Sequence, residues 1–275
     1  MRRPLLAGAL AAQLIAASAF LAIRPADGTT GSPPTTAVSD SQQTPRSVRA
    51  VSLGGARTDL LLRRVRADLD GAVAAVERFW GDDWPREIVI VATDSDAQFV
   101  AEAHLDPRRQ WTDIAAVAVA DEVDPTDRLA TGQRIVLAPG ASVMSDPALR
   151  IVLTHELFHL AARADTALDA PRWLTEGVAD FVARPAAPIP PGAAANTALP
   201  TDADLDRPGP DRSAGYDRAW WFARFVANGY GTDGLRRLYV AACGPGHGDL
   251  ATAVRRALGV DLAELQNGWA GWLNR

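Results

Sequence analysis

In the first half of the chain, the hydrophobic pattern switches between the period of a helix and that of a strand. Apolar side chains recur at steps of three or four from Thr58 to Trp80, which predicts an amphipathic helix. The runs that follow Trp84 are short, apolar and partly β-branched, which is typical of buried strands. The elements expected here are strands at 87–92, 114–120 and 134–138, a short helix at 94–105 and a loop at 121–131.

Helical patterns dominate the second half. Asp146 as a capping acid and Pro147 at the first helical position predict the start of a central helix that runs through the apolar segment ending at Ala162. Residues 184–212 have no period and are rich in Pro, Ala, Gly and Asp, so we expect a long loop, either a lid beside a cleft or surface filler. Further helices are expected at 171–182, 216–228, 235–242, 250–258 and 262–273. Strands followed by helices predict an α+β fold.

The N-terminus has the features of an export signal. Arg2 and Arg3 precede an apolar run at 5–23, and Ala19 closes a small-residue cleavage site within it. The same run is just long enough to span a bilayer, so a cleaved signal peptide and a retained anchor are both compatible with it. Either way, the rest of the chain is expected outside the cytoplasm. The expected organisation is a signal peptide or anchor at 1–23, a flexible Pro/Ser/Thr-rich linker at 24–46 and one folded domain at 47–275.

Charge and cysteine content exclude some partners. All 28 basic residues are arginine, yet the net charge is −5, which argues against a nucleic-acid surface with its clustered basic residues. No nucleic acid is expected as a partner, and a membrane contact is expected only through the N-terminal segment. Cys243 is the only cysteine, so the chain has no intramolecular disulfide, and this residue is expected to be a buried apolar one.

The apolar segment of the central helix contains the pattern His-Glu-x-x-His, formed by His155, Glu156 and His159. Because four residues are about one helical turn, the two imidazoles lie on one face and converge. Zn²⁺ takes nitrogen, oxygen or sulfur ligands in a tetrahedron, so these imidazoles can fill two of its corners. The Glu156 carboxylate can take a proton from a water that the metal activates. The alternative is a buried helix whose histidines only satisfy local hydrogen bonds.

The next helix supplies candidates for a third ligand and for its support. Glu176 follows His159 after a helix end, a short turn and a returning helix, which can bring its carboxylate to the third corner. One corner is then left for water, as a catalytic zinc site needs. Asp180 is four residues further on, on the same face as Glu176. A carboxylate there can accept the outer N–H of a ligand histidine and fix its tautomer.

With both motifs in view, the chain resembles the gluzincin metallopeptidases of the peptidase MA clan. It is most similar to small bacterial MA-like domains in which a Trp-Leu-x-Glu-Gly-x-Ala-(Asp/Glu) signature follows His-Glu-x-x-His. A metzincin would need a glycine and a third histidine soon after His159, and residues 160–165 contain neither. The residues that carry the resemblance are His155, Glu156, His159, Trp173, Leu174, Glu176, Gly177, Ala179 and Asp180.

The resemblance implies a zincin-like fold, in which a mixed sheet packs on the active-site helix and a helical lobe follows. In such folds an edge strand beside that helix binds extended peptide by strand addition. Main-chain pairing of this kind gives affinity without sequence preference. A core strand with no such role is the alternative. The implied substrate-binding residues are Ile114, Ala115, Ala116, Val117 and Ala118.

Amide hydrolysis also needs a donor for the oxyanion of the tetrahedral intermediate. Tyr216, in the aromatic-rich helix at 216–228, is the candidate, because few other donors are left. Core packing is the alternative for Tyr216, and His247 in a glycine-rich loop is another candidate donor. His104 is expected to be a surface residue, because nothing metal-like surrounds it.

These features predict an exported zinc-dependent metallopeptidase that hydrolyses peptide bonds of a peptide or protein substrate, with one catalytic Zn²⁺ and Glu156 as general base. Two other interpretations stay open: a zinc-binding interaction module of the cell envelope with little or no turnover, and a hydrolase of cell-wall peptide or of a non-peptide bond. The intact Glu156 argues against the first, because a structural zinc site has no use for a general base. The sequence does not discriminate against the second.

Overall fold

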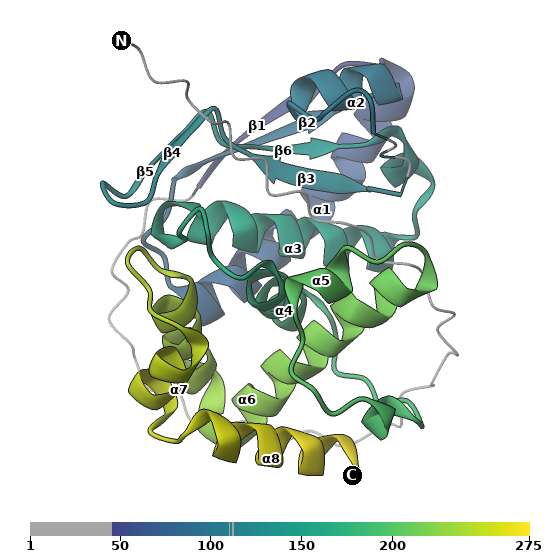
Figure 1. Cartoon of the computed structure of the whole chain (residues 1–275). Helices are drawn as coiled ribbons and strands as arrows, with labels where there is room; N and C mark the ends of the chain where they lie inside the picture. Colours follow the sequence, from purple (N-terminus) through teal and green to yellow (C-terminus); the bar gives the residue numbers. More distant parts are fainter. Residues whose placement is uncertain (1–45, 110, 112) are drawn as a thin grey trace, which may run out of the picture.

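A computed structural model describes residues 46–109, 111 and 113–275. The expected signal or anchor at 1–23, and the expected linker at 24–46 except Arg46, lie outside these residues. The fold is α+β: a mixed sheet lies above the central helix, and most of the remaining helices lie below it (Figure 1). Of the helices in the described part of the chain, none has both the length and the apolar character that crossing a bilayer requires.

The main sheet has four strands in the order β1-β2-β6-β3. Three of them run parallel, and β3 closes one edge antiparallel to β6. β1 was not among the expected strands, because most of its side chains are exposed and carry no hydrophobic pattern. The strands are β1 (Ser47–Ser52), β2 (Glu87–Ala92), β3 (Ala116–Val119) and β6 (Arg134–Leu137).

Alternate side chains of the strands enter two separate cores. Ile88 and Ile90 of β2 face the helices α1 (Ala56–Trp80) and α3. Val89 and Val91 face the opposite side, where Phe99 of α2 packs on them. Figure 1 shows α2 on the outer face of the sheet and α1 and α3 on the inner face. α2 (Asp96–Glu102) is shorter than the helix expected at 94–105.

The segment 121–131 was expected to be a loop, and that prediction was wrong. It forms a two-stranded hairpin of β4 (Glu122–Asp124) and β5 (Leu129–Thr131). The Asp124 carboxylate accepts backbone N–H bonds inside the turn, and Arg128 takes a left-handed φ of 51° to close it. Strands of three mostly exposed residues are too short to show a period in the sequence.

The second half is helical, as expected, with two differences in detail. The N-cap of α3 is Ser145, whose hydroxyl accepts from the N–H of Ala148, so Asp146 is the first helical residue rather than the cap. The helices expected at 216–228 and 235–242 are joined in α6, which departs from helical geometry at Gly231. The helices are α3 (Asp146–Ala162), α4 (Arg172–Ala183), α5 (Asp202–Leu205), α6 (Pro210–Cys243), α7 (Leu250–Leu258) and α8 (Leu262–Leu273), with 3-10 turns at Pro139–Val143, Arg163–Asp165 and Ala193–Ala195.

The long segment 184–212 contains the 3-10 turn Ala193–Ala195, α5 and the start of α6, and it is tied to three helices. The backbone carbonyl of Ala198 accepts hydrogen bonds from Arg218 of α6 and from the indole N–H of Trp269 of α8. The carboxylate of Asp202 accepts the backbone N–H of Trp173, in the first turn of α4, at 2.8 Å. This bond satisfies a helix end that would otherwise be unpaired.

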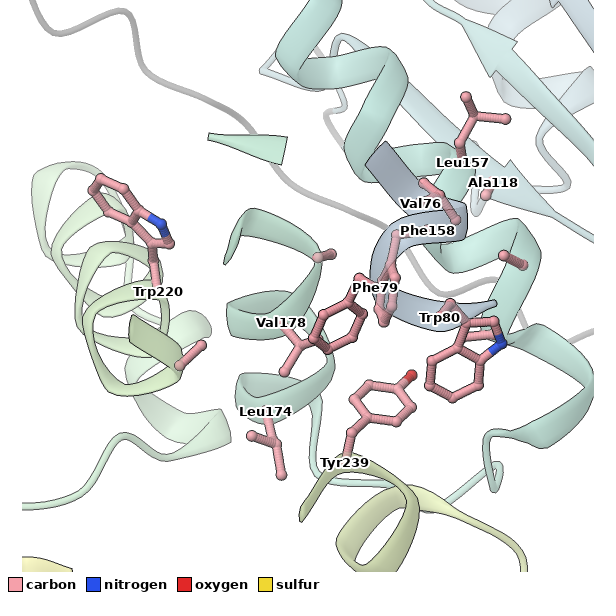
Figure 2. Packing of buried hydrophobic residues seen from close by; sticks show 14 of the residues in the cluster. Val76, Phe79, Trp80, Ala118, Leu157, Phe158, Leu174, Val178, Trp220 and Tyr239 are labelled. Atoms are coloured by element: carbon pink, nitrogen blue, oxygen red, sulfur yellow. The ribbon is translucent and has the colours of Figure 1, made fainter. Parts of the chain in front are cut away.

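Aromatic rings of α1, α3 and α6 join the sheet and the helices packed on it to the helical lobe formed by the second half of the chain. Phe158 of α3 lies between Phe79 and Trp80 of α1, with ring centroids 5.8 Å from each, in edge-to-face geometry. Tyr239 of α6 packs on Trp80 and Phe158, with ring centroids at 5.2 and 5.5 Å (Figure 2). Val178 of α4 lies beside Phe79 in this view. The sheet with its helices and the helical lobe therefore share one core. Edge-to-face pairs add to the stability that this core gains from burial alone.

Candidate metal centre

The helix α3 carries the His-Glu-x-x-His pattern through the middle of the molecule. Every residue from 151 to 162 is buried, because α1, β3 and α4 pack around it. A helix that is apolar on all sides belongs in such a position. Its N-terminal half is tied to α1 by Arg64, which donates to Asp146, and by Arg150, which donates to Asp68, both at 2.8 Å. α3 is therefore a fixed platform for its few polar side chains.

The side chains of His155, His159 and Glu176 converge at one point between α3 and α4. The Nε2 atoms of the two histidines are 3.0 Å apart. Oxygens of Glu176 lie 3.2 Å from Nε2 of His155 and 3.5 Å from Nε2 of His159. A tetrahedral site with metal–ligand bonds of about 2.0–2.1 Å has ligand–ligand edges of about 3.3–3.4 Å, which is close to these separations. This buried group could hold a metal ion.

Asp180 lies where the sequence predicted it, behind a histidine of this group. Its Oδ1 is 3.0 Å from Nδ1 of His155, which leaves Nε2 of that ring free to face the other donors. Burial by itself would lower the pKa of His155, but hydrogen bonds with Asp180 and Glu176 outweigh it and raise this pKa well above its usual range. Burial by itself would raise the pKa of Glu176, but the two imidazoles hold this pKa far below its usual range. Glu176 is therefore an ionised carboxylate in this site.

The position of α4 depends on a close approach between two backbones. A Cβ added at Gly177 would lie 2.4 Å from the carbonyl oxygen of Ala219 in α6. Only glycine permits this contact. Because Gly177 directly follows Glu176, the same contact sets where the third candidate ligand lies. This is a physical reason for the glycine in the signature that follows the His-Glu-x-x-His pattern.

Glu156 leaves the metal-binding group and points to the sheet. Its Oε2 accepts the backbone N–H of Ala118 at 2.7 Å, and the residue is only 2% exposed. Burial raises the pKa of Glu156, and the nearby Glu176 adds to this, while His155 and His159 oppose it. A carboxylate with a raised pKa is better matched to proton transfer near neutral pH than an ordinary one.

The expected substrate strand is β3, which begins at Ala116 and lies at the edge of the main sheet beside α3. Ile114 and Ala115 precede it, and the carbonyl of Ala115 still accepts the N–H of Ala138, directly after β6. The side chain of Val117 enters the outer core, and those of the two flanking alanines enter the inner one. Both backbone groups of Ala118 are taken by side chains, since Glu156 of α3 accepts its N–H and Arg163, directly after α3, donates to its carbonyl.

Arg163 is a polar residue of the site that the sequence reasoning placed in a turn. It is 5% exposed, and its Nη2 donates to the carbonyl of Ala118 at 2.6 Å. Burial lowers its pKa, and attraction to Glu156 and Glu176 opposes that shift. Its Nε has no hydrogen-bond partner. The available signal was the spacing, because Arg163 follows His159 by one helical turn.

The candidate oxyanion donors lie in different surroundings. Tyr216 is buried in the helical lobe, where its phenol interacts electrostatically with Arg172 at the start of α4. The hydroxyl of Tyr239 lies 2.8 Å from that of Thr166, and this phenol interacts electrostatically with both Arg163 and Glu176. The sequence pattern predicts only a helix around Tyr239, whereas these contacts connect its phenol to the site.

His247 and His104 lie outside the metal-binding group. His247 is 3.4 Å from Asp169 and lines a cavity of about 870 Å³ between the β4–β5 hairpin, α6 and α7, which does not include the metal-binding residues. His104 is exposed, as expected, and contacts Arg134. Cys243 is buried, also as expected.

No protein-family model matches the chain, and none of the curated proteins is significantly similar to it.

Proposed function

We propose that this chain is a zinc-dependent metallopeptidase of the gluzincin type. One observation carries the proposal: the buried side chains of His155, His159 and Glu176 bring their donor atoms within 4.8 Å of one another, while a separate buried carboxylate, Glu156, lies beside them and outside this group. Zn²⁺ would be held by His155, His159 and Glu176. When bound, it would supply a Lewis acid that lowers the pKa of a water and polarises a scissile carbonyl.

The protein groups around the metal centre have separate tasks in this proposal. Glu156, with its raised pKa, accepts the proton of the attacking water and later delivers it to the leaving amine. Asp180 holds His155 in the tautomer that turns Nε2 to the metal. Arg163 brings a positive charge next to the carboxylates and to the carbonyl of Ala118.

A zincin-like arrangement is part of the same proposal. The antiparallel edge strand β3 runs beside the helix with the His-Glu-x-x-His pattern, and the third ligand comes from the next helix, which supports this assignment. An extended peptide is the substrate that such an edge would accept. Pairing of a peptide with Ala118 would require Glu156 and Arg163 to move, so their bonds to Ala118 belong to the substrate-free state. With the expected export signal, the substrate would be met outside the cytoplasm.

A zinc-binding interaction module is the second candidate. The observation that favours it is burial, since His155, His159 and Glu176 are each at most 5% exposed. A substrate could reach them only if neighbouring groups moved. Under this alternative the metal would stabilise the junction of the two lobes without turnover.

Metal content is the first test. Elemental analysis of the purified full chain should give about one zinc per chain, and His155→Ala and Glu176→Ala should lose it. His104→Asn is the matched control, because it removes an exposed histidine and asparagine tolerates the left-handed φ of 54° at that position. Zinc retained in Glu176→Ala would remove that residue from the ligand set. Peptide-library digestion by the loaded chain then separates a peptidase from a binding module.

The oxyanion donor needs its own test. If Tyr216 has this role, Tyr216→Phe should lower the turnover of a peptide substrate by up to about 10²-fold without altering zinc content. Unchanged turnover would assign Tyr216 to the core of the helical lobe.

A further inference from the structure

A chain of charged groups leads from the metal-binding group to the surface through Asp180. Oδ1 of this carboxylate faces Nδ1 of His155, and Oδ2 accepts a hydrogen bond from Nη1 of Arg184 at 3.2 Å. The other terminal nitrogen of Arg184 donates to Asp217 of α6 at 2.9 Å. The side chains become more exposed along this path: 4% for Asp180, 21% for Arg184 and 36% for Asp217.

The guanidinium of Arg184 is held on a third side by an aromatic ring. It lies over the indole of Trp220 in α6, 3.9 Å from the ring centroid. The backbone N–H of Arg184 also caps α4 by donating to the carbonyl of Asp180 at 2.8 Å. A planar fork that is stacked on a ring and bonded to two carboxylates has little freedom left, so it can fix the orientation of its partners.

We propose that Arg184 is a positioning residue of the metal centre, and this inference rests on the proposed metal site. Arg184 fixes the carboxylate of Asp180, and that carboxylate fixes the ring of His155. Without Arg184, Oδ2 of Asp180 would lose its cationic partner in a buried setting, and the carboxylate could rotate away from the imidazole. Groups that support a metal ligand in this way typically change metal affinity when removed.

The same contacts make α6 part of the metal centre. Asp217 and Trp220 are one turn apart on α6, and both hold Arg184. Metal binding and the docking of α6 on α4 are therefore coupled, and the coupling is reciprocal. Metal should strengthen this docking, and a loss of the docking contacts should weaken metal binding by the same factor.

Zinc affinity of the full chain, measured by competition with a chelator, tests the inference without any assay of hydrolysis. Asp180→Asn should weaken binding by about 10- to 100-fold, as for direct partners of a ligand. Arg184→Met, which keeps an apolar side chain on Trp220, should weaken it by roughly 3- to 10-fold, since it acts one contact further out. Asp217→Asn should weaken it in the same direction without a change in α4.

Arg224→Met is the matched control. Its guanidinium lies over the same Trp220 ring, 4.9 Å from the centroid, and its Nη1 has no hydrogen-bond partner. We expect its zinc affinity to equal that of the wild type. Arg184→Met in the Asp180→Asn background should add nothing, because the path is already broken.

Three results would overturn the inference. Arg184→Met and Asp217→Asn with wild-type affinity would show that the fork does not act on the ligand. Equal losses in Arg184→Met and Arg224→Met would assign the effect to stacking on Trp220. An effect of Arg184→Met that persists in the Asp180→Asn background would place it outside this path. A wild type that binds no zinc would instead refute the proposed metal site itself.

Discussion

The two sides of the candidate metal centre each hold a carboxylate; the two are equally buried, but their pKa values are shifted in opposite directions. Glu156 on the sheet side and Glu176 on the helical side are each 2% exposed. Burial raises the pKa of Glu156, whose hydrogen-bond partner is the neutral N–H of Ala118. The pKa of Glu176 lies far below its usual range, because His155 and His159 outweigh the effect of burial. Equal burial therefore does not imply an equal role.

Under the proposed function, this difference would separate proton transfer from metal binding within one site. A pair of carboxylates whose surroundings push their pKa values apart can be assigned to different tasks. The sheet side provides a low-dielectric position next to an edge strand, suited to a group that must take and release a proton. The helical side provides a charged network of Glu176, Asp180 and Arg184, which under the same proposal would hold a cation and its ligands in place.

The largest effect should come from removing the base while keeping its shape. Glu156→Gln can still accept the N–H of Ala118 through its amide oxygen, but it cannot take a proton. Turnover of a peptide substrate should fall by about 10²–10⁴-fold, with zinc content unchanged. Glu122→Gln on the exposed β4 strand is the control and should match the wild type in both measurements. Full turnover in a zinc-loaded Glu156→Gln chain would refute the assigned division of roles.

Replacing a glycine by alanine should lower the stability of the chain at Gly177 in α4 and raise it at Gly71 in α1. Gly177→Ala drives a Cβ to 2.4 Å from a backbone carbonyl of α6, which no side-chain movement can relieve. We expect a loss of about 3 kcal/mol in unfolding free energy, the upper end for overpacking, and weaker zinc binding. Gly71→Ala on α1 meets nothing within 4 Å. It should stabilise the chain by about 0.5–1 kcal/mol.

Urea unfolding at fixed zinc concentration measures both glycine variants. If Gly177→Ala were as stable as Gly71→Ala, α4 and α6 would separate easily. The position of Glu176 would then not depend on their close contact.

Local patterns in the sequence predict much of the fold and half of the site. The helix at Ala56–Trp80 and the strand at Glu87–Ala92 have clear periods, and the structure contains both. The convergence of His155, His159 and Glu176 follows from the spacing within one helix and the return of the next. Such features depend on neighbours in sequence, so periodicity and spacing reveal them.

The remaining features depend on partners that are distant in sequence. The hairpin of β4 and β5 has strands too short for a period, and β1 is recognised only through its pairing with β2. Arg163 reads as part of a turn and Arg184 as the start of a loop. Their burial is decided by Ala118 in the sheet and by Trp220 in α6. An arginine in a sequence does not indicate which distant groups will surround it.

The smallest loss expected at the site itself concerns Arg163, the cation of the sheet side. Arg163→Met leaves the buried carbonyl of Ala118 without its donor, a loss of roughly 1–3 kcal/mol for such a group. It also removes the desolvation penalty of a buried guanidinium, which offsets part of that loss. We therefore expect a net loss of about 1–2 kcal/mol in unfolding free energy, measured in urea, and a smaller loss for Arg163→Lys.

Arg224→Met again serves as the comparison, because its guanidinium donates no comparable bond and should change stability by less than about 0.5 kcal/mol. If Arg163→Met were as stable as the wild type, the free energy regained by removing the buried charge would equal the free energy lost with the hydrogen bond to Ala118. Arg163 would then be kept for its charge beside Glu156 and Glu176 rather than for the strand it contacts. Lower turnover in Arg163→Met at unchanged stability and zinc content would support that role. The sheet side would then, like the helical side, act through a charged group.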